Sequence, residues 1–263
     1  MKRQMTVLIL GFLFAANAWS IGDHERPKDR KAHNAFVEAL KVDHPIIALV
    51  PIRMMDVPEH DAAVTEFHEL LTIKLERFEY QIVPAEVYAE AWQAELESIG
   101  GIYDAVTGRR NEEKFAAAQT RVRAAIQASH GATAFLETSI DNREIPHQGG
   151  LARFGGVKSW PHVKGAARLG GSTLNIGVVR ALSLHAELYS AAGELLFENY
   201  GGIQLLTRET REGKTMAYPA DELLRNTEFN KGAIHLALRN MLYDGRTLQR
   251  DQKAKRSKKP RKP

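Results

Sequence analysis

The chain has 263 residues, a formal net charge of +4 and no cysteine. Its length allows one well-formed hydrophobic core or two modest ones. The absence of cysteine excludes disulfides, thiolate metal sites and a cysteine nucleophile. It also predicts that the protein is not a lipoprotein, because the bacterial lipid anchor needs a cysteine at the cleavage point.

The first eighteen residues show the features of a cleavable secretory signal peptide in the expected order. Lys2 and Arg3 supply positive charge, residues 7–15 form an apolar run, and Ala16-Asn17-Ala18 has the small-x-small pattern that signal peptidase accepts. An uncleaved membrane anchor is disfavoured because the apolar run is well short of the ~20 residues that span a bilayer. We therefore expect cleavage after Ala18 and a periplasmic or secreted protein.

Charge is distributed unevenly along the chain. Lys2 and Arg3 contribute +2, and residues 246–263 contribute +8 from nine basic residues and Asp251, so the body between them carries −6. Self-repulsion and low hydrophobicity predict that residues 246–263 form a disordered basic tail. Two interpretations of this tail stay open: attraction to anionic polymers or lipid headgroups, and a solubilising role. The signal peptide argues against nucleic acid as a partner.

Residues 19–44 are polar and are predicted to form a linker or arm before one α/β domain at 45–245. The apolar run at 46–52 is typical of a strand buried on both faces. Apolar residues at helical spacing predict helices at 61–78, 85–99 and about 109–130, with strands at 80–83 and 132–140. This βαβαβ start indicates a sheet that is at least partly parallel.

The second half of the domain has a different pattern. Residues 141–171 contain seven glycines and are predicted to form a long inserted loop. Residues 178–189 alternate with period two, and the turn at 190–193 leads into a returning strand at 194–200, which predicts a β-hairpin. Gly201-Gly202 is interpreted as a break, and a C-terminal helix is predicted at 233–242. The fold class is therefore a single α/β domain with a mixed sheet.

No complete catalytic motif is present, and we expect no cofactor and no metal. Gly213-Lys214-Thr215 lacks the earlier glycine of a phosphate-binding loop, and His68-Glu69 lacks the second histidine of a zinc-protease motif. The histidines and acids at 59–68 are interpreted as a solvated helix start. A periplasmic hydrolase of glycans or phosphoesters stays open as an alternative. Convergence of its candidate groups, Glu137, Asp141, His147 or His185, in one pocket would favour it.

The glycine-rich loop is the most distinctive feature of the sequence, because it combines cations with aromatic residues. Such a combination suits binding to a protein partner, a sugar or an anionic polymer, and loops of this length are often functional. The alternative is that Trp160 fixes the loop to the core while the cations are solvated. The candidate partner-binding residues are Arg153, Phe154, Lys158, Trp160, Lys164 and Arg168.

The strand patterns resemble those of small bacterial envelope domains. The stretch Ile47-Ala48-Leu49-Val50-Pro51-Ile52, the helix after it, and Tyr80-Gln81-Ile82-Val83-Pro84 followed by Tyr88 and Trp92 resemble the opening of the TolB amino-terminal domain and of the curli-export lipoprotein family. The stretch Val179-Arg180-Ala181-Leu182-Ser183-Leu184 and the hairpin up to Gly202 also suit these domains. The likeness covers roughly residues 45 to 205, and its motifs are generic strand and helix patterns.

This resemblance implies a protein that is not an enzyme and that serves assembly, secretion or regulation in the periplasm or at the outer membrane. Many proteins of these families are lipoproteins, and the lack of cysteine here departs from that pattern. We expect an exported, non-catalytic binding or assembly-accessory protein. Its expected partner is another envelope protein or an anionic envelope polymer, and the sequence does not indicate an oligomeric state.

Overall fold

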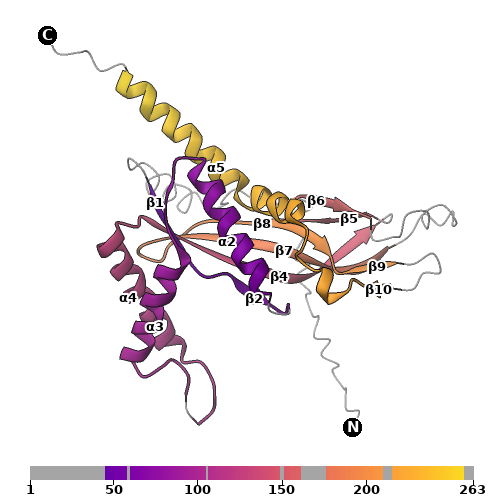
Figure 1. The fold of residues 1–263 in the computed structure, drawn as a ribbon, viewed down its shortest axis with the longest axis horizontal. Coiled ribbons are helices and arrows are strands. Elements are labelled where there is room, and N and C mark those ends of the chain that lie inside the picture. Colours follow the sequence, from indigo (N-terminus) through magenta and orange to yellow (C-terminus); the bar gives the residue numbers. More distant parts are fainter. Residues whose placement is uncertain are drawn as a thin grey trace, which may run out of the picture.

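The computed structural model describes residues 45–57, 60–104, 106–148, 151–160, 176–209 and 215–257. Within these ranges the chain forms a single α/β domain in which four α-helices accompany a mixed sheet of eight strands, as the sequence predicts (Figure 1). The predicted signal peptide, with Ala16 and Ala18, and the predicted arm lie outside the described ranges.

The first half of the domain supplies the parallel part of the sheet. Strand β1 (Ile46–Leu49) pairs in parallel with β3 (Gln81–Val83) on one side and with β4 (Ala134–Gln148) on the other. Strand β2 (Arg53–Met55) also pairs in parallel with β4, further along the edge of β4 that pairs with β1. The predicted connections are present as α2 (Asp61–Glu76), α3 (Ala85–Ser98) and α4 (Glu112–His130).

The antiparallel part of the sheet is built from three long strands. Strand β7 (Ile176–Ser190) pairs with β4 along its whole length and with β8 (Leu195–Leu205) on its other side, which confirms the predicted hairpin. Strands β4 and β7 have 15 residues each, whereas about five or six is usual. Strand β8 leads to α5 (Thr227–Ser257) through β9 (Thr207–Glu209), β10 (Thr215–Ala217) and the short 3₁₀ helix η2 (Ala220–Glu222).

The prediction of an unstructured loop at 141–171 is wrong for much of its length. Strand β4 continues to Gln148, and β5 (Leu151–Phe154) and β6 (Val157–Ser159) form a second hairpin. Gly155 and Gly156 have φ values of 46° and 77°, which suits a two-residue hairpin turn that only glycine adopts readily. The glycines that suggested a loop therefore make a tight turn, while residues 161–175 lie outside the described ranges.

The interpretation of Gly201-Gly202 as a break is also wrong, because β8 passes through both residues. A Cβ atom on Gly201 would lie 1.9 Å from the carbonyl oxygen of Ala233 in α5, and one on Gly202 would lie 2.5 Å from the carbonyl oxygen of Phe154. The Gly202 amide donates a hydrogen bond of 2.8 Å to the Gly155 carbonyl. The two glycines therefore allow α5 and the β5–β6 hairpin to approach β8 closely.

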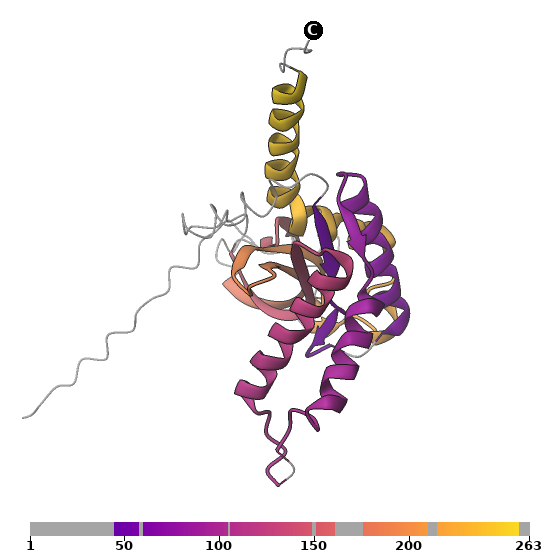
Figure 2. The same cartoon turned by 90° about the vertical axis from the view of Figure 1, so that its left-hand side faces the viewer.

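The core occupies both faces of the sheet. On one face α2 and α5 pack over the even-numbered apolar residues of β4 and β7, including Leu136, Ile140 and Leu184. The opposite face is covered at one end by α3 and α4, around Phe135, and at the other end by the β5–β6 hairpin, around Phe154 and Ile145. Figure 2 shows α3 and α4 extending away from the sheet as a pair.

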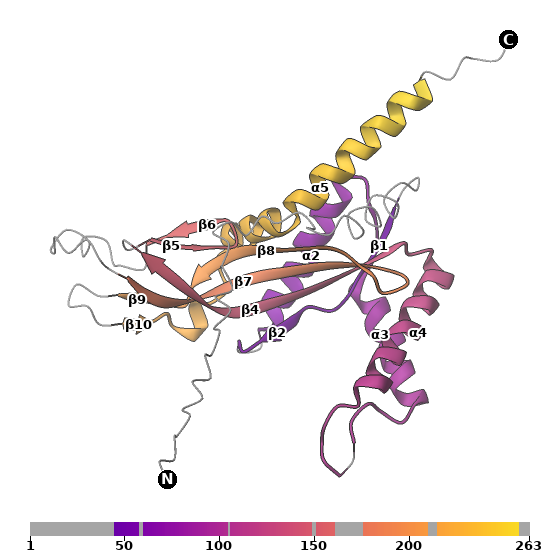
Figure 3. The same ribbon diagram turned by 180° about the vertical axis from the view of Figure 1, so that it is seen from behind.

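Helix α5 is much longer than the predicted helix at 233–242 and runs to Ser257. The prediction of a disordered tail therefore fails for residues 246–257, whereas 258–263 lie outside the described ranges. Lys, Arg and Gln are strong helix formers, and the stretch 246–257 contains neither glycine nor proline. Figure 3 shows this end of α5 projecting beyond the sheet. Of the helices in the described residues, none is long and apolar enough to cross a membrane.

Candidate functional site

A band of polar side chains lies on the sheet face that carries α3 and α4. Along β4, Phe135 belongs to the apolar cluster beneath these helices and Ile145 to the cluster beneath the β5–β6 hairpin. Side chains alternate between the two faces of a strand. Between these two apolar clusters, the side chains on the same face as Phe135 and Ile145 are polar. This polar band consists of Glu137, Ser139, Asp141 and Arg143 on β4, Ser183, His185 and Glu187 on β7, and Glu198 and Tyr200 on β8.

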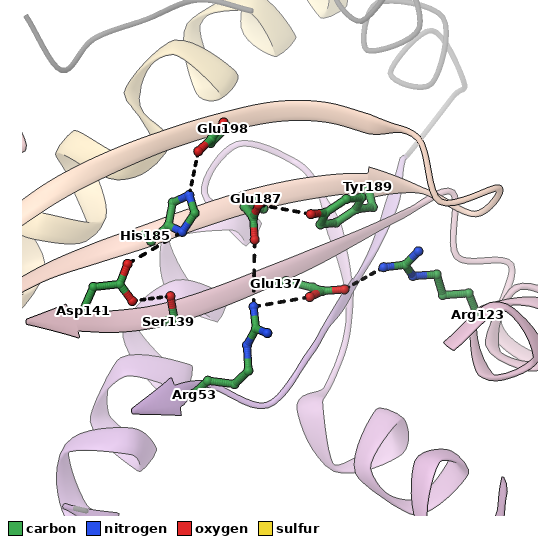
Figure 4. A network of polar contacts seen from close by, with 9 residues as sticks. All are labelled: Arg53, Arg123, Glu137, Ser139, Asp141, His185, Glu187, Tyr189 and Glu198. Atoms are coloured by element: carbon green, nitrogen blue, oxygen red, sulfur yellow. Dashed lines mark hydrogen bonds and ion pairs between the residues drawn. The ribbon is translucent and has the colours of Figure 1, made fainter. Parts of the chain in front are cut away.

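One end of the polar band holds a buried ion pair. Arg123 of α4 contacts Glu137 at 2.6 Å, and only 8% and 7% of the two side chains are exposed. The other oxygen of Glu137 lies 3.6 Å from Arg53 of β2, which also lies 3.9 Å from Glu187 (Figure 4). Because both oxygens of Glu137 face cations, this carboxylate is held in a structural role.

Tyr189 completes this end of the band. Its hydroxyl donates a hydrogen bond of 3.1 Å to Glu187, and the Arg123 guanidinium lies 4.8 Å from its ring centre. Burial raises the pKa of the Tyr189 hydroxyl well above its ordinary value, and the neighbouring Glu187 carboxylate raises it further. Tyr189 therefore remains a neutral donor that holds Glu187 in place.

His185 lies at the centre of the band and has a defined contact on each ring nitrogen. Its Nε2 lies 3.0 Å from Glu198, and its Nδ1 lies 3.8 Å from Asp141 (Figure 4). The imidazole stacks on the Tyr200 ring at 4.1 Å with an interplanar angle of 5°. Burial raises the pKa of Tyr200 to about 12, so the stacking partner is a neutral phenol. Asp141 is held in turn by the Ser139 hydroxyl, which donates to it at 2.6 Å.

A pocket of about 380 Å³ opens beside His185. The Arg143 guanidinium lies 4.1 Å from the Tyr200 ring centre. Within the described residues, its Nη1 and the Asn142 Oδ1 atom are buried without a hydrogen-bond partner. The residues that line the pocket are Arg53, Met55, Asp56, Ser139, Asp141, Asn142, Arg143 and His185.

The hydrolase candidates converge only in part. Asp141 and His185 share the pocket, whereas Glu137 is engaged by Arg123. His147 lies near the far end of β4, opposite Gly177 and Ala152, and is 3% exposed. A Ser-His-Asp triad needs a serine that contacts the histidine, but Ser139 contacts Asp141 instead. The band therefore does not have the arrangement of that triad.

Among the described residues near the start of α2, the histidines and acids do not converge either, and Glu59 lies outside the described ranges. The Nε2 atom of His68 accepts a hydrogen bond of 3.2 Å from the Ile52 amide, and burial lowers the pKa of this histidine. Glu66 accepts a hydrogen bond of 3.0 Å from Asn230 of α5. A different group, which the sequence analysis did not single out, has its potential ligand atoms within 4.8 Å of one another: His185, Glu187 and Glu198.

The β5–β6 hairpin places the predicted partner-binding residues on its two sides. Arg153 and Lys158 are directly opposite each other and exposed, and Trp160, just after β6, is 60% exposed. Phe154 lies on the other side, is 1% exposed and belongs to the core, so it does not reach a partner. Trp160 does not fix the segment to the core. Lys164 and Arg168 lie outside the described ranges.

Comparisons with known proteins give only distant likenesses. No family model matches the chain, and no curated protein matches its sequence. Lipoprotein GNA1162 from Neisseria meningitidis has 15% identity and a TM-score of 0.32, over 60% of this chain and 81% of that chain. The LpoB C-terminal domain from Salmonella enterica has 12% identity and a TM-score of 0.30, over 66% and 95%. The hypothetical protein CT253 from Chlamydia trachomatis has 9% identity and a TM-score of 0.31, over 78% and 96%.

These three neighbours are bacterial proteins, and one of them is a lipoprotein. None of the three is the TolB amino-terminal domain, so the likeness is not specific to that family. At these TM-scores and identities, the neighbours support no argument about the function of this chain.

Proposed function

We propose that this chain is an exported, non-catalytic protein of the cell envelope that binds another envelope component as a binding or assembly-accessory module. Export is supported by the signal features of residues 1–18. Binding is supported above all by one observation, the exposed surface formed by Arg153, Lys158 and Trp160 on the β5–β6 hairpin. We call these three residues the hairpin surface.

The chemistry of the hairpin surface favours an anionic partner. Arg153 and Lys158 are opposite each other across the strand pair, and like charges in this position repel. A partner carboxylate or phosphate would relieve this repulsion, and the Arg153 guanidinium suits planar recognition of either group. Trp160 adds a large apolar ring, and Trp and Arg are the side chains most often dominant in interfaces. The partner is therefore an acidic segment of an envelope protein or an anionic envelope polymer.

The hairpin is held rigidly enough to present this surface without much ordering on binding. Phe154 and Val157 pack into the cluster formed with Ile145 and Val179. The Gly155 carbonyl accepts the hydrogen bond from Gly202 of β8, which fixes the turn to the sheet. A pre-organised surface loses less conformational entropy when a partner binds.

A pull-down from envelope extract at low and high salt tests this proposal. We expect the protein from Trp19 to Pro263 to recover a specific partner. We expect recovery to be lost when Arg153, Lys158 and Trp160 are all replaced by alanine. Recovery should also weaken at high salt, because exposed charges are screened.

The matched control removes two cations and one aromatic ring from a different exposed region, which comprises the connection between α3 and α4 and the first turn of α4. Tyr103, Arg109 and Lys114 are exposed there, and their replacement by alanine should leave partner recovery unchanged. Equal recovery by both triple variants would contradict the proposed surface. Failure to recover a partner at either salt concentration would contradict the binding function itself.

A periplasmic hydrolase acting on a glycan or phosphoester is the second candidate function. One observation favours it: Asp141 and His185 meet in a pocket that also contains Arg53 and Arg143. It is the weaker candidate because the His185 Nε2 atom is already engaged by Glu198 and no nucleophile lies in contact with this histidine in the described residues.

A further inference from the structure

The polar band contains a constellation of ligands that the proposed binding function does not use. His185 and Glu187 lie two residues apart on β7 and share one face, and Glu198 lies directly opposite Glu187 on β8. One nitrogen and two carboxylate oxygens from these side chains all lie within 4.8 Å of one another. Donors about 2.1 Å from a tetrahedral ion lie about 3.4 Å apart, so small rotations of the exposed Glu198 side chain would close the site.

We propose that His185, Glu187 and Glu198 bind one divalent transition-metal ion, with Zn²⁺ as the best match. Imidazole nitrogen favours zinc and its neighbours over magnesium and calcium, and carboxylate oxygens complete zinc sites with three protein ligands. This departs from the sequence-based expectation of no metal. It is independent of the hairpin surface and its partner.

The surroundings of His185 are those of a metal ligand. A ligating histidine usually donates its second N–H to a carboxylate, which fixes its tautomer and orientation. Asp141 lies 3.8 Å from Nδ1, which is too far for a hydrogen bond, so a small shift of its side chain would be needed to bring it into this role. Asp141 is itself held by the Ser139 hydroxyl. The Tyr200 ring stacks on the imidazole and restricts its rotation. Nε2 is thereby directed towards Glu198, where the ion would lie.

The two glutamates supply a charge that a cation would balance. Glu187 and Glu198 are directly opposite each other across the β7–β8 pair, and like charges in this arrangement destabilise a sheet. Arg53 compensates Glu187 only partly, at 3.9 Å and with half of its side chain exposed. A divalent cation bound by both carboxylates and the neutral imidazole gives a site with no net charge. Glu187 keeps its orientation through Tyr189 and Arg53.

The test is zinc binding measured by isothermal titration calorimetry and by metal analysis after dialysis. The protein from Trp19 to Pro263 is prepared without a polyhistidine tag and is first treated with a chelator. We expect one equivalent of Zn²⁺ to bind much more tightly than Mg²⁺. Glu198→Gln and His185→Gln should each weaken zinc binding more than about tenfold, and Asp141→Asn should weaken it about 10- to 100-fold through loss of the outer carboxylate.

Glu194→Gln is the matched control, because Glu194 is exposed on the same hairpin but lies outside the cluster. It should leave zinc affinity unchanged. Since Glu198 is about half exposed, its substitution tests the site without disturbing the core, and equal thermal unfolding of the metal-free variants checks this. Absence of zinc binding would overturn the proposal. It would also be overturned if His185→Gln and Glu198→Gln bound zinc as tightly as the natural chain does. The second of these outcomes would assign the ion to other histidines of the chain.

Discussion

Replacement of Gly201 by alanine is expected to cost about 3 kcal/mol or more of folding stability. Overpacking of a core usually costs about 1–3 kcal/mol, and here the added methyl group meets backbone. A Cβ at this position would lie 1.9 Å from the Ala233 carbonyl oxygen and 2.9 Å from the Ala237 amide nitrogen. Neither atom can move unless α5 separates from β8. The free energy of unfolding in urea, with circular dichroism as the signal, measures the loss.

Gly232→Ala provides a control for which we expect the opposite effect on folding stability. Gly232 lies in α5, next to Ala233, and a Cβ added there meets nothing within 4 Å. Alanine is favoured over glycine inside a helix by roughly 0.5–1 kcal/mol, so this variant should be more stable than the natural chain. A Gly201→Ala variant as stable as the natural chain would show that α5 is not packed on β8 as described.

Replacement of Glu137 by leucine is expected to cost about 3–5 kcal/mol, because it leaves the buried Arg123 guanidinium without its counter-charge. Arg123→Met should cost less, since Glu137 still has Arg53 at 3.6 Å. The double variant should be more stable than the sum of the two single effects predicts, because neither buried charge remains. Urea unfolding of the four proteins measures this double-mutant cycle.

The pair Lys231–Glu228 is the exposed control for this cycle. Its atoms lie 3.0 Å apart, and 51% and 80% of the two side chains are exposed. Exposed pairs contribute at most about 1 kcal/mol, so Glu228→Gln should have a small effect. A Glu137→Leu variant that loses no more stability than Glu228→Gln would contradict the buried ion pair between α4 and β4.

The sequence predicted which helices and strands are present better than it predicted the residues at which they begin and end. Hydrophobic periodicity identified strands β1 and β3, the start of β4, the helices α2, α3 and α4 between them, and the β7–β8 hairpin, because each buries a regular apolar stripe. It did not indicate the short strand β2. It failed at residues 141–160, where glycines form a tight turn between strands, and at 246–257, where helix-forming cations continue α5. Composition suggested a long loop in the first place and disorder in the second, whereas backbone geometry and helix propensity favoured regular structure.

The contribution of Glu198 and Tyr200 to the polar band could not be derived from the sequence because it depends on the register of β8. Hydrogen bonding at the turn, from the Ser190 amide to the Glu194 carbonyl, would by itself place Glu187 opposite Phe197. A bulge between Leu188 and Tyr189 shifts the pairing by one residue, and Glu187 then faces Glu198. A shift of one residue moves a side chain to the other face of a sheet. The candidate metal site therefore depends on a single bulge that no residue pattern indicates.

The most direct test of the proposed envelope-binding function is site-specific photo-crosslinking in living cells. A photoreactive phenylalanine derivative replaces Trp160 in the hairpin surface, and in a control protein it replaces Val106, which is 93% exposed between α3 and α4. We predict a covalent adduct with an envelope component at position 160 after irradiation and none at position 106. Absence of an adduct at position 160, or the same adduct at both positions, would contradict a specific binding surface on the β5–β6 hairpin.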